Sequence, residues 1–236
     1  LFVAHHVAVD RISLDILRRE MCRSLEVVQA TPLDQAAAGA DSAFLRSVSA
    51  GSEARLPLDR ADVALWQRRA AAAGLFRPAV ERRAARFAEL GPRPLALPAD
   101  LPRPRQFTFR GADVRCAVTE DLQRSADEAA CNHGVTLFEL MLALFAVVLC
   151  RGANQHEVVV GVPHHGREPE TLGVVGCLMN VMLACCALPA GLALHGALRA
   201  VHEEMDGARG DLAVPTLEVL AELQARSLIL PEPSRC

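Results

Sequence analysis

A pair of histidines and a nearby aspartate are the side chains of this sequence best suited to chemistry. His5 and His6 end a short apolar run that begins at residue 1, and Asp10 follows four residues later. A histidine near neutral pH can accept a proton from a nucleophile or donate a hydrogen bond to a developing negative charge, provided that its ring is held in one tautomer. Asp10 can hold the ring, or it can fix the loop by pairing with an arginine. Two adjacent histidines at the end of a strand can also be purely structural.

A second histidine pair lies in VVVGVPHHGRE, residues 158–168. Its glycines permit sharp turns after a buried strand. Arg167 is a fixed positive charge that can grip a carboxylate. His164 and His165 raise a metal hypothesis, because four imidazoles converge if the two loops meet. Adjacent histidines point in different directions, however, and no cysteine or carboxylate follows at ligand spacing, so we expect a solvated turn without a metal.

Asn180 is the third candidate for a functional side chain. It is the only polar side chain in the apolar run LGVVGCLMNVMLACCAL, residues 172–188. A buried amide without partners costs about 1–3 kcal/mol. Asn180 therefore either forms structural hydrogen bonds within the protein or is a polar group that faces a channel.

The elements that position these residues follow from the hydrophobic periodicity. A strand that ends near His5 is followed by a helix from about Ile12, which Asp10 or Ser13 can cap. The further elements that we predict are two helices within 59–90, a strand at 107–118, a helix at 119–133, a buried helix at 136–151, strands at 156–163 and 178–188, and helices at 192–206 and 215–226. Because helices and strands alternate from about residue 107 onward, the expected class is a layered α/β (α+β) architecture.

Five prolines between residues 92 and 104 provide the clearest internal boundary. Proline lacks a backbone donor and pushes the preceding residue towards extended geometry, so this stretch cannot be helical. We therefore expect three parts: residues 1–90, a connector at 91–106, and residues 107–236.

The composition indicates a globular chain from a reducing compartment. The chain has 236 residues, of which 51% are hydrophobic, enough to bury a core. The 8 cysteines form no CxxC pair, which indicates buried free thiols rather than disulfides or zinc ligands. A net charge of −3 argues against nucleic acid or a membrane surface as a partner. There is no apolar run of about 20 residues and no secretory signal pattern, so we expect a cytoplasmic protein.

Taken together, these pieces resemble the condensation domain of nonribosomal peptide synthetases, which has the chloramphenicol-acetyltransferase-like fold. HHVAVDR at 5–11 is similar to the family motif HHxxxDG, and ADVALWQ at 61–67 is similar to its tryptophan-bearing helix. LPADLPRP at 97–104 and FRGA at 109–112 resemble the family's proline-rich connector and the strand after it. LGVVGCLMN at 172–180 resembles its IGxFVNT segment.

The resemblance implies a function and roles for particular residues. In that family two substrates, each a thioester on the phosphopantetheine arm of a carrier protein, enter a tunnel between two lobes, and the acceptor amine attacks the donor thioester to form a peptide bond. His6 would then be the catalytic histidine, which positions or deprotonates the amine or stabilises the tetrahedral oxyanion, and His5 its structural neighbour. Asp10 would pair with Arg167, and Asn180 would line the tunnel. The expected partners are carrier proteins and adenylation domains, with no directly bound cofactor or metal.

The sequence also departs from the family pattern. Arg11 replaces the glycine after the aspartate, where it can obstruct the acceptor side or give Asp10 a local partner. The later HQDxPFE motif is barely visible around Pro215. The family has a long lobe before the histidine motif and further elements beyond the point where this chain stops. We therefore expect one partial lobe and an incomplete second lobe.

Two other functions stay open at this stage. A degenerate, non-catalytic remnant that at most docks a carrier protein would agree with Arg11 and with the weak late motif. A free-standing acyltransferase of the same fold would use acyl-CoA or another acyl donor, and it also carries an HHxxxD motif. The proline-rich connector and the FRGA strand favour the synthetase. The amino acids that are joined, the donor configuration and the choice between amide and ester cannot be read from these motifs.

Overall fold

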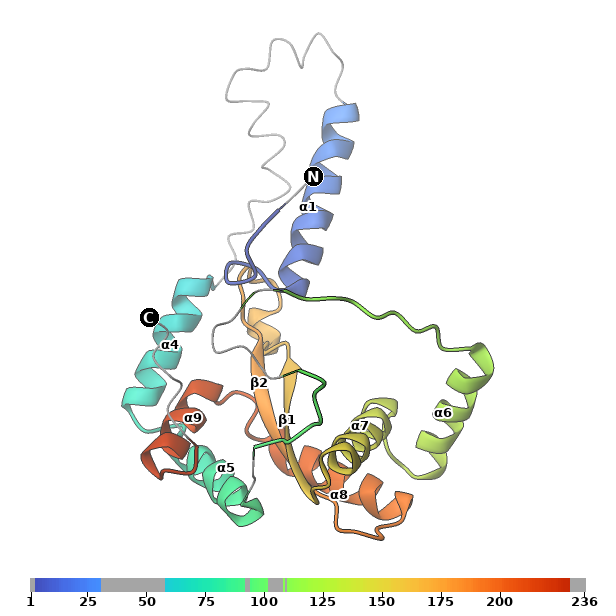
Figure 1. Cartoon of the computed structure of the whole chain (residues 1–236). Coiled ribbons are helices and arrows are strands. Elements are labelled where there is room, and N and C mark those ends of the chain that lie inside the picture. The colour runs from blue at the N-terminus through green and yellow to red at the C-terminus, as the bar shows by residue number, and fades with distance from the viewer. Residues whose placement is uncertain (1–2, 31–57, 92–93, 102–107, 109, 230–236) are drawn as a thin grey trace. The chain divides into compact units, whose positions relative to one another are not determined.

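The computed structural model describes residues 3–30, 58–91, 94–101, 108 and 110–229. Strands β1 (Glu157–His164) and β2 (Asn180–Ala187) pair in a two-stranded sheet (Figure 1). The helices are α1 (Arg11–Ala30), α4 (Arg60–Ala72), α5 (Arg77–Leu90), α6 (Glu120–Asn132), α7 (Leu137–Ala153), α8 (Leu194–Arg209) and α9 (Thr216–Ala225), and a 3-10 helix covers Pro169–Thr171.

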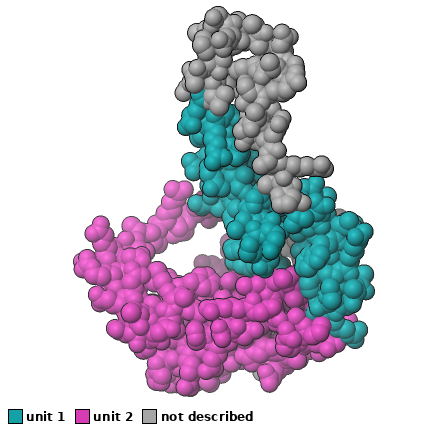
Figure 2. All heavy atoms as spheres, turned by 180° about the vertical axis from the view of Figure 1, so that it is seen from behind, with its two compact units in different colours: residues 1–77, 163–181 teal, residues 78–162, 182–236 magenta. Residues whose placement is uncertain are grey.

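The chain forms two compact units, which Figure 2 shows in different colours. Unit 1 contains residues 1–77 and 163–181, and unit 2 contains residues 78–162 and 182–236. The histidine motif and Arg167 both belong to unit 1. The predicted division into 1–90, 91–106 and 107–236 stays a prediction.

The main hydrophobic core lies in unit 2, where α7 packs against α6 and α8. Buried side chains of these helices and of the two strands form one cluster, in which Ala143, Ala146 and Val201 are fully buried. α7 begins with a capping box. Its Thr136 side chain accepts a hydrogen bond from the Glu139 amide at 3.2 Å, and the Glu139 carboxylate accepts one from the Thr136 amide at 2.7 Å.

The helix predicted at 136–151 is buried on one face only. Four large apolar side chains of α7 are 51–66% exposed: Phe138, Met141, Phe145 and Val148. Their spacing places them along one stripe of the helix, opposite the face that packs on the core. Of the described helices, none is alone long and apolar enough to cross a membrane, whereas α6 and α7 meet that criterion only as a pair bent by 100°.

The two helices predicted within 59–90 are present. Asp59 caps α4 in a capping box with Asp62, and Gly74 ends the turn after it with a φ of 72°. The break between the two helices lies at residues 73–76, and Pro78 lies in the first turn of α5. Proline is tolerated there, since the first amides of a helix have no partner within the helix.

The strand predicted at 107–118 is wrong for the residues of that range that the structure describes. Residues 108 and 110–118 are exposed and lie outside any strand. A strand requires a neighbour to complete its hydrogen bonds. The described sheet contains only β1 and β2. Residues 107–118 alternate between apolar and polar side chains as a strand would, but the described residues include no neighbouring strand with which they pair.

Candidate active site

Asp10 lies at the N-terminal end of α1 and is only 4% exposed. Its Oδ1 accepts hydrogen bonds from the amide of Ser13 at 2.8 Å and lies 2.7 Å from the Ser13 hydroxyl. Its Oδ2 accepts a hydrogen bond from the amide of Leu178 at 3.1 Å. Asp10 therefore caps its own helix and also binds the segment that leads into β2.

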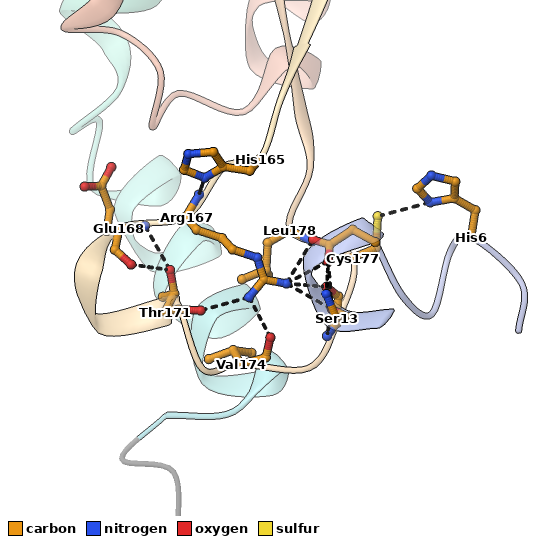
Figure 3. A network of polar contacts seen from close by, with 11 residues as sticks. His6, Ser13, His165, Arg167, Glu168, Thr171, Val174, Cys177 and Leu178 are labelled. Carbon is orange, nitrogen blue, oxygen red and sulfur yellow. Dashed lines mark hydrogen bonds and ion pairs between the residues drawn. The ribbon is translucent and has the colours of Figure 1, made fainter. Parts of the chain in front are cut away.

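Arg167 provides the positive charge opposite Asp10. Its side chain is fully buried, and Nη2 lies 2.9 Å from both carboxylate oxygens of Asp10. Nη1 donates to the carbonyls of Thr171 at 2.9 Å and Val174 at 2.6 Å (Figure 3). The guanidinium thus joins the carboxylate to the loop that follows β1. The structure brings together the two residues whose pairing the family resemblance implied.

Ser13 completes this buried network. Its hydroxyl lies 2.8 Å from the carbonyl oxygen of Gly176 and accepts hydrogen bonds from the Gly176 amide at 2.9 Å and from Arg167 Nη2 at 3.0 Å. The residue is fully buried. We refer to Asp10, Ser13 and Arg167 as the buried triad. The sequence suggested Ser13 only as a helix cap. Its contact with Gly176, which is 163 positions away in the chain, cannot be predicted from a local sequence pattern.

Gly166 lets the loop before Arg167 approach this segment closely. Its φ is +60°, and a Cβ at this position would lie 2.0 Å from the carbonyl oxygen of Leu178. Both the left-handed backbone and the close contact exclude a larger side chain. Gly166 is thus a backbone requirement of the site.

We expect Gly166→Ala to lower the free energy of unfolding of unit 1 by about 2–4 kcal/mol, because it adds backbone strain to a direct clash. Gly74→Ala is the matched control, because its φ is +72° but an added Cβ would meet no atom within 4 Å. Urea unfolding can be followed by the fluorescence of Trp66, the single tryptophan, which lies in unit 1. Equal losses for the two variants would show that the contact with Leu178 is unimportant.

His6 lies beside the buried triad and is exposed to solvent. Its Nδ1 is 4.0 Å from the Sγ of Cys177, towards which the ring points in Figure 3. The contact of His5 is local, since its Nδ1 accepts a hydrogen bond from the amide of Val7 at 3.1 Å. The two histidines therefore differ in their surroundings, and His6 is the one that contacts the segment fixed by the triad.

Two other predicted residues, Arg11 and Asn180, are not members of the buried triad. Arg11 has a side chain that is 91% exposed and lies 3.9 Å from Asp15, so it is not the local partner of Asp10. Asn180 is partly buried and is the first residue of β2. Its assignment to a tunnel wall stays a prediction.

The second histidine pair makes contacts within its own turn. His164 Nδ1 accepts from the Gly166 amide at 3.2 Å, and His165 Nδ1 accepts from the Arg167 amide at 3.0 Å. Burial and the nearby His165 lower the pKa of His164. Among the described residues, no group of three or more His, Cys, Asp or Glu side chains is placed to hold a metal ion.

The contacts of Asp10 change its acidity. Burial by itself raises the pKa of this carboxyl group, but hydrogen bonds from Ser13, Leu178 and Arg167 stabilise the carboxylate and lower the pKa below its usual value. The folded state therefore binds the proton of Asp10 less readily than the unfolded state. Stability from this group is present above the usual pKa of an aspartate and is lost as the pH falls through the lowered value.

The lowered pKa of Asp10 predicts that unit 1 becomes less stable in acid. We expect the free energy of unfolding, measured with urea and Trp66 fluorescence, to fall steadily as the pH is lowered from 5 towards 3. Asp10→Asn removes the titrating group, so this variant should be less stable at pH 7 and should lose less on acidification. The same pH dependence in parent and variant would contradict the assignment of this effect to Asp10.

Solved structures with the same architecture establish the fold. The X-domain in the complex of the X-domain and OxyB from teicoplanin biosynthesis has a TM-score of 0.74 at 22% identity, over 94% of this chain and 46% of that chain. The first condensation domain of the calcium-dependent antibiotic synthetase, with substrate analogue 2a, has a TM-score of 0.61 at 20% identity, over 98% of this chain and 48% of that one. The predicted α/β class with a chloramphenicol-acetyltransferase-like fold is confirmed.

Sequence comparison then defines the family. A family model described as condensation domain matches residues 61–228. A linear gramicidin synthase protein from Brevibacillus parabrevis is 30% identical over 230 residues, which are 97% of this chain and 4% of that protein. Phosphinothricin tripeptide synthetase PhsC from Streptomyces viridochromogenes is 26% identical over 240 residues, 97% of this chain and 20% of that protein. The chain belongs to the condensation domain family, and it spans a small part of the length of these curated relatives.

Proposed function

We propose that this chain contributes to peptide-bond formation in nonribosomal peptide synthesis, with His6 as its catalytic residue. The observation that carries the proposal is the position of His6. It is exposed on a short loop that leads to Asp10, and Asp10 is fixed by its buried ion pair with Arg167. Catalytic groups are commonly presented in this way, on a short accessible loop held by a rigid support. The motif and the family membership agree with this assignment.

The reaction joins an acceptor amine to a donor acyl group. The amine nitrogen attacks the thioester carbon, a tetrahedral oxyanion forms, and the C–S bond then breaks to release the thiolate of the donor arm. An imidazole at His6 can accept the amine proton or donate a hydrogen bond to the oxyanion. Holding amine and thioester together supplies a further part of the rate, because the encounter of the two substrates no longer costs entropy.

The expected partners are carrier proteins, whose phosphopantetheine arms present both substrates, and neighbouring adenylation domains. Two observations support this. The relatives include a linear gramicidin synthase protein and a tripeptide synthetase, and a similar solved structure is a four-domain nonribosomal peptide synthetase, with a TM-score of 0.66 at 20% identity. No cofactor bound directly by this chain is needed for the chemistry. A role for Asn180 at the substrate channel, a structural role for His5 and a cytoplasmic location are further parts of the proposal.

The proposal is tested by mixing the chain, in its native polypeptide, with a donor and an acceptor carrier protein that are each loaded with an amino acid. Mass spectrometry of the acceptor carrier should show a dipeptidyl thioester, and an unloaded donor carrier should give none. Product from acyl-CoA but not from the loaded donor carrier would indicate a free-standing acyltransferase. A folded protein that binds carriers and forms no product with either donor would indicate a non-catalytic docking module.

A further inference from the structure

We propose that Cys177 is a positioning residue for His6. Its thiol donates to His6 Nδ1, which leaves the ring proton on Nε2 and makes His6 a hydrogen-bond donor to the substrate. The inference rests on the proposed function, because it requires His6 to face the reacting groups. It specifies that Nε2 is the ring nitrogen that faces the substrate. It also assigns the ring the role of hydrogen-bond donor rather than that of base.

The chemistry of the two groups favours one direction for this hydrogen bond. Cys177 Sγ and His6 Nδ1 are 4.0 Å apart, at the upper end of the range for a hydrogen bond that involves sulfur. A thiol is a weak donor and its sulfur a weak acceptor, whereas the lone pair of an imidazole nitrogen is a good acceptor. The favoured arrangement is therefore S–H to Nδ1. A neutral imidazole carries one ring proton, so that proton is then on Nε2.

Cys177 can orient the ring because its own backbone is fixed on both sides. On one side, Gly176 forms hydrogen bonds with the Ser13 hydroxyl through its amide at 2.9 Å and its carbonyl at 2.8 Å. On the other side, the Leu178 amide donates to Asp10 Oδ2 at 3.1 Å. The buried triad therefore holds both peptide neighbours of Cys177. His6 is exposed, and its contact with this thiol connects the ring to the rigid part of unit 1.

A ring protonated on Nε2 is suited to stabilise the oxyanion. As the C–N bond forms, the carbonyl electrons move to oxygen, and the Nε2–H group donates a hydrogen bond to that oxygen. When the intermediate collapses, the C–S bond breaks and the donor thiolate leaves. The proton lost by the amine goes to that thiolate or to water. His6 keeps its proton throughout, so in this scheme it is not the base.

Two neighbouring cysteines do not compete with Cys177 in chemical tests. Cys185 and Cys186 are buried, and burial together with the charge of Glu204 raises their pKa values to about 11 and 12. They therefore stay protonated and unreactive near neutral pH. A single alkylation within residues 168–199, which trypsin releases as one peptide, reports on Cys177.

The first test determines the tautomer by NMR. In the full chain labelled with ¹⁵N-histidine, long-range ¹H–¹⁵N correlations should show His6 protonated on Nε2. Cys177→Val removes the thiol and should give His6 a mixture of tautomers. His5 is the internal reference, because its Nδ1 accepts the Val7 amide and this bond does not involve Cys177. A proton on His6 Nδ1 in the parent, or an unchanged His6 spectrum in Cys177→Val, would overturn the inference.

The second test measures coupling and rate. The rate of alkylation of Cys177 by iodoacetamide, measured across a range of pH, should differ between the parent and His6→Ala. In the condensation assay, Cys177→Val should be roughly tenfold slower than the parent. An alkylation profile unaffected by His6→Ala, or equal condensation rates with Val and Cys, would contradict the positioning role. The NMR and alkylation results do not depend on turnover, so a failure of the proposed function is distinguishable from a failure of this inference.

Discussion

Replacing His6 with alanine should lower the rate of dipeptidyl thioester formation by about 10²- to 10⁴-fold. The imidazole is the group that acts on the charge or proton that develops when the amine attacks, and alanine offers no substitute. The expected loss appears in the chemical step, so it is measured in a single turnover with both carrier proteins loaded and in excess. Some rate should remain, because the positioning of the two substrates does not depend on His6.

His5→Ala is the matched control for this experiment. His5 is adjacent in the sequence and also exposed, but its Nδ1 accepts a hydrogen bond from the nearby Val7 amide, and among the described residues it forms no hydrogen bond with the segment fixed by the triad. We therefore expect its replacement to change the rate by no more than a few-fold. A larger loss for His5→Ala than for His6→Ala would reverse the assignment of the two roles. Equal rates for His6→Ala and the parent would remove His6 from the mechanism.

The second large effect is expected for Asp10→Ala, which should lower the free energy of unfolding of unit 1 by about 3–5 kcal/mol. The substitution leaves the fully buried guanidinium of Arg167 without its counter-ion, and it removes the acceptor of the Ser13 and Leu178 amides. Breaking one partner of a buried pair is costly because the remaining charge stays out of water. Urea unfolding followed by Trp66 fluorescence measures the loss within the same unit.

Asp15→Ala is the control for Asp10→Ala. Asp15 is on the same helix, its side chain is 52% exposed, and its partner Arg11 is 3.9 Å away. Exposed pairs of this kind contribute about 0–1 kcal/mol, so this variant should unfold almost like the parent. Similar losses for the two aspartates would show that the pair of Asp10 and Arg167 is no more important than a surface contact.

The candidate site was predictable from the sequence only in part. Local pattern placed Asp10 at the start of a helix, and the resemblance to condensation domains linked it to Arg167, 157 positions away. Nothing in the sequence indicated that Ser13 reaches Gly176 or that Cys177 contacts His6. These contacts are made between segments far apart in the chain, and their geometry depends on the fold rather than on spacing.

For the fold as well, elements that depend on local sequence were predicted correctly, whereas features that depend on distant parts of the chain were not. The helices α4, α6 and α7 were predicted from local patterns and are present, and in the structure they begin at the capping residues Asp59, Thr119 and Thr136. The strand predicted at 107–118 is missing from the described part of that range, because alternation does not reveal whether a partner strand is available. Periodicity likewise did not show that one apolar face of α7 is exposed.

The most direct test of this account is a double-mutant cycle between Asp10 and Arg167. Asp10→Ala, Arg167→Ala and the double variant are compared with the parent in both urea unfolding and the single-turnover condensation assay. Because each single variant leaves the other member of the pair buried and unsatisfied, the double variant should lose little more than either single one. We predict a coupling energy of about 3–5 kcal/mol in stability, close to the loss of one single variant, and a matching non-additivity in rate. Additive losses in both measurements would contradict the claim that this buried pair holds the loop that carries His6.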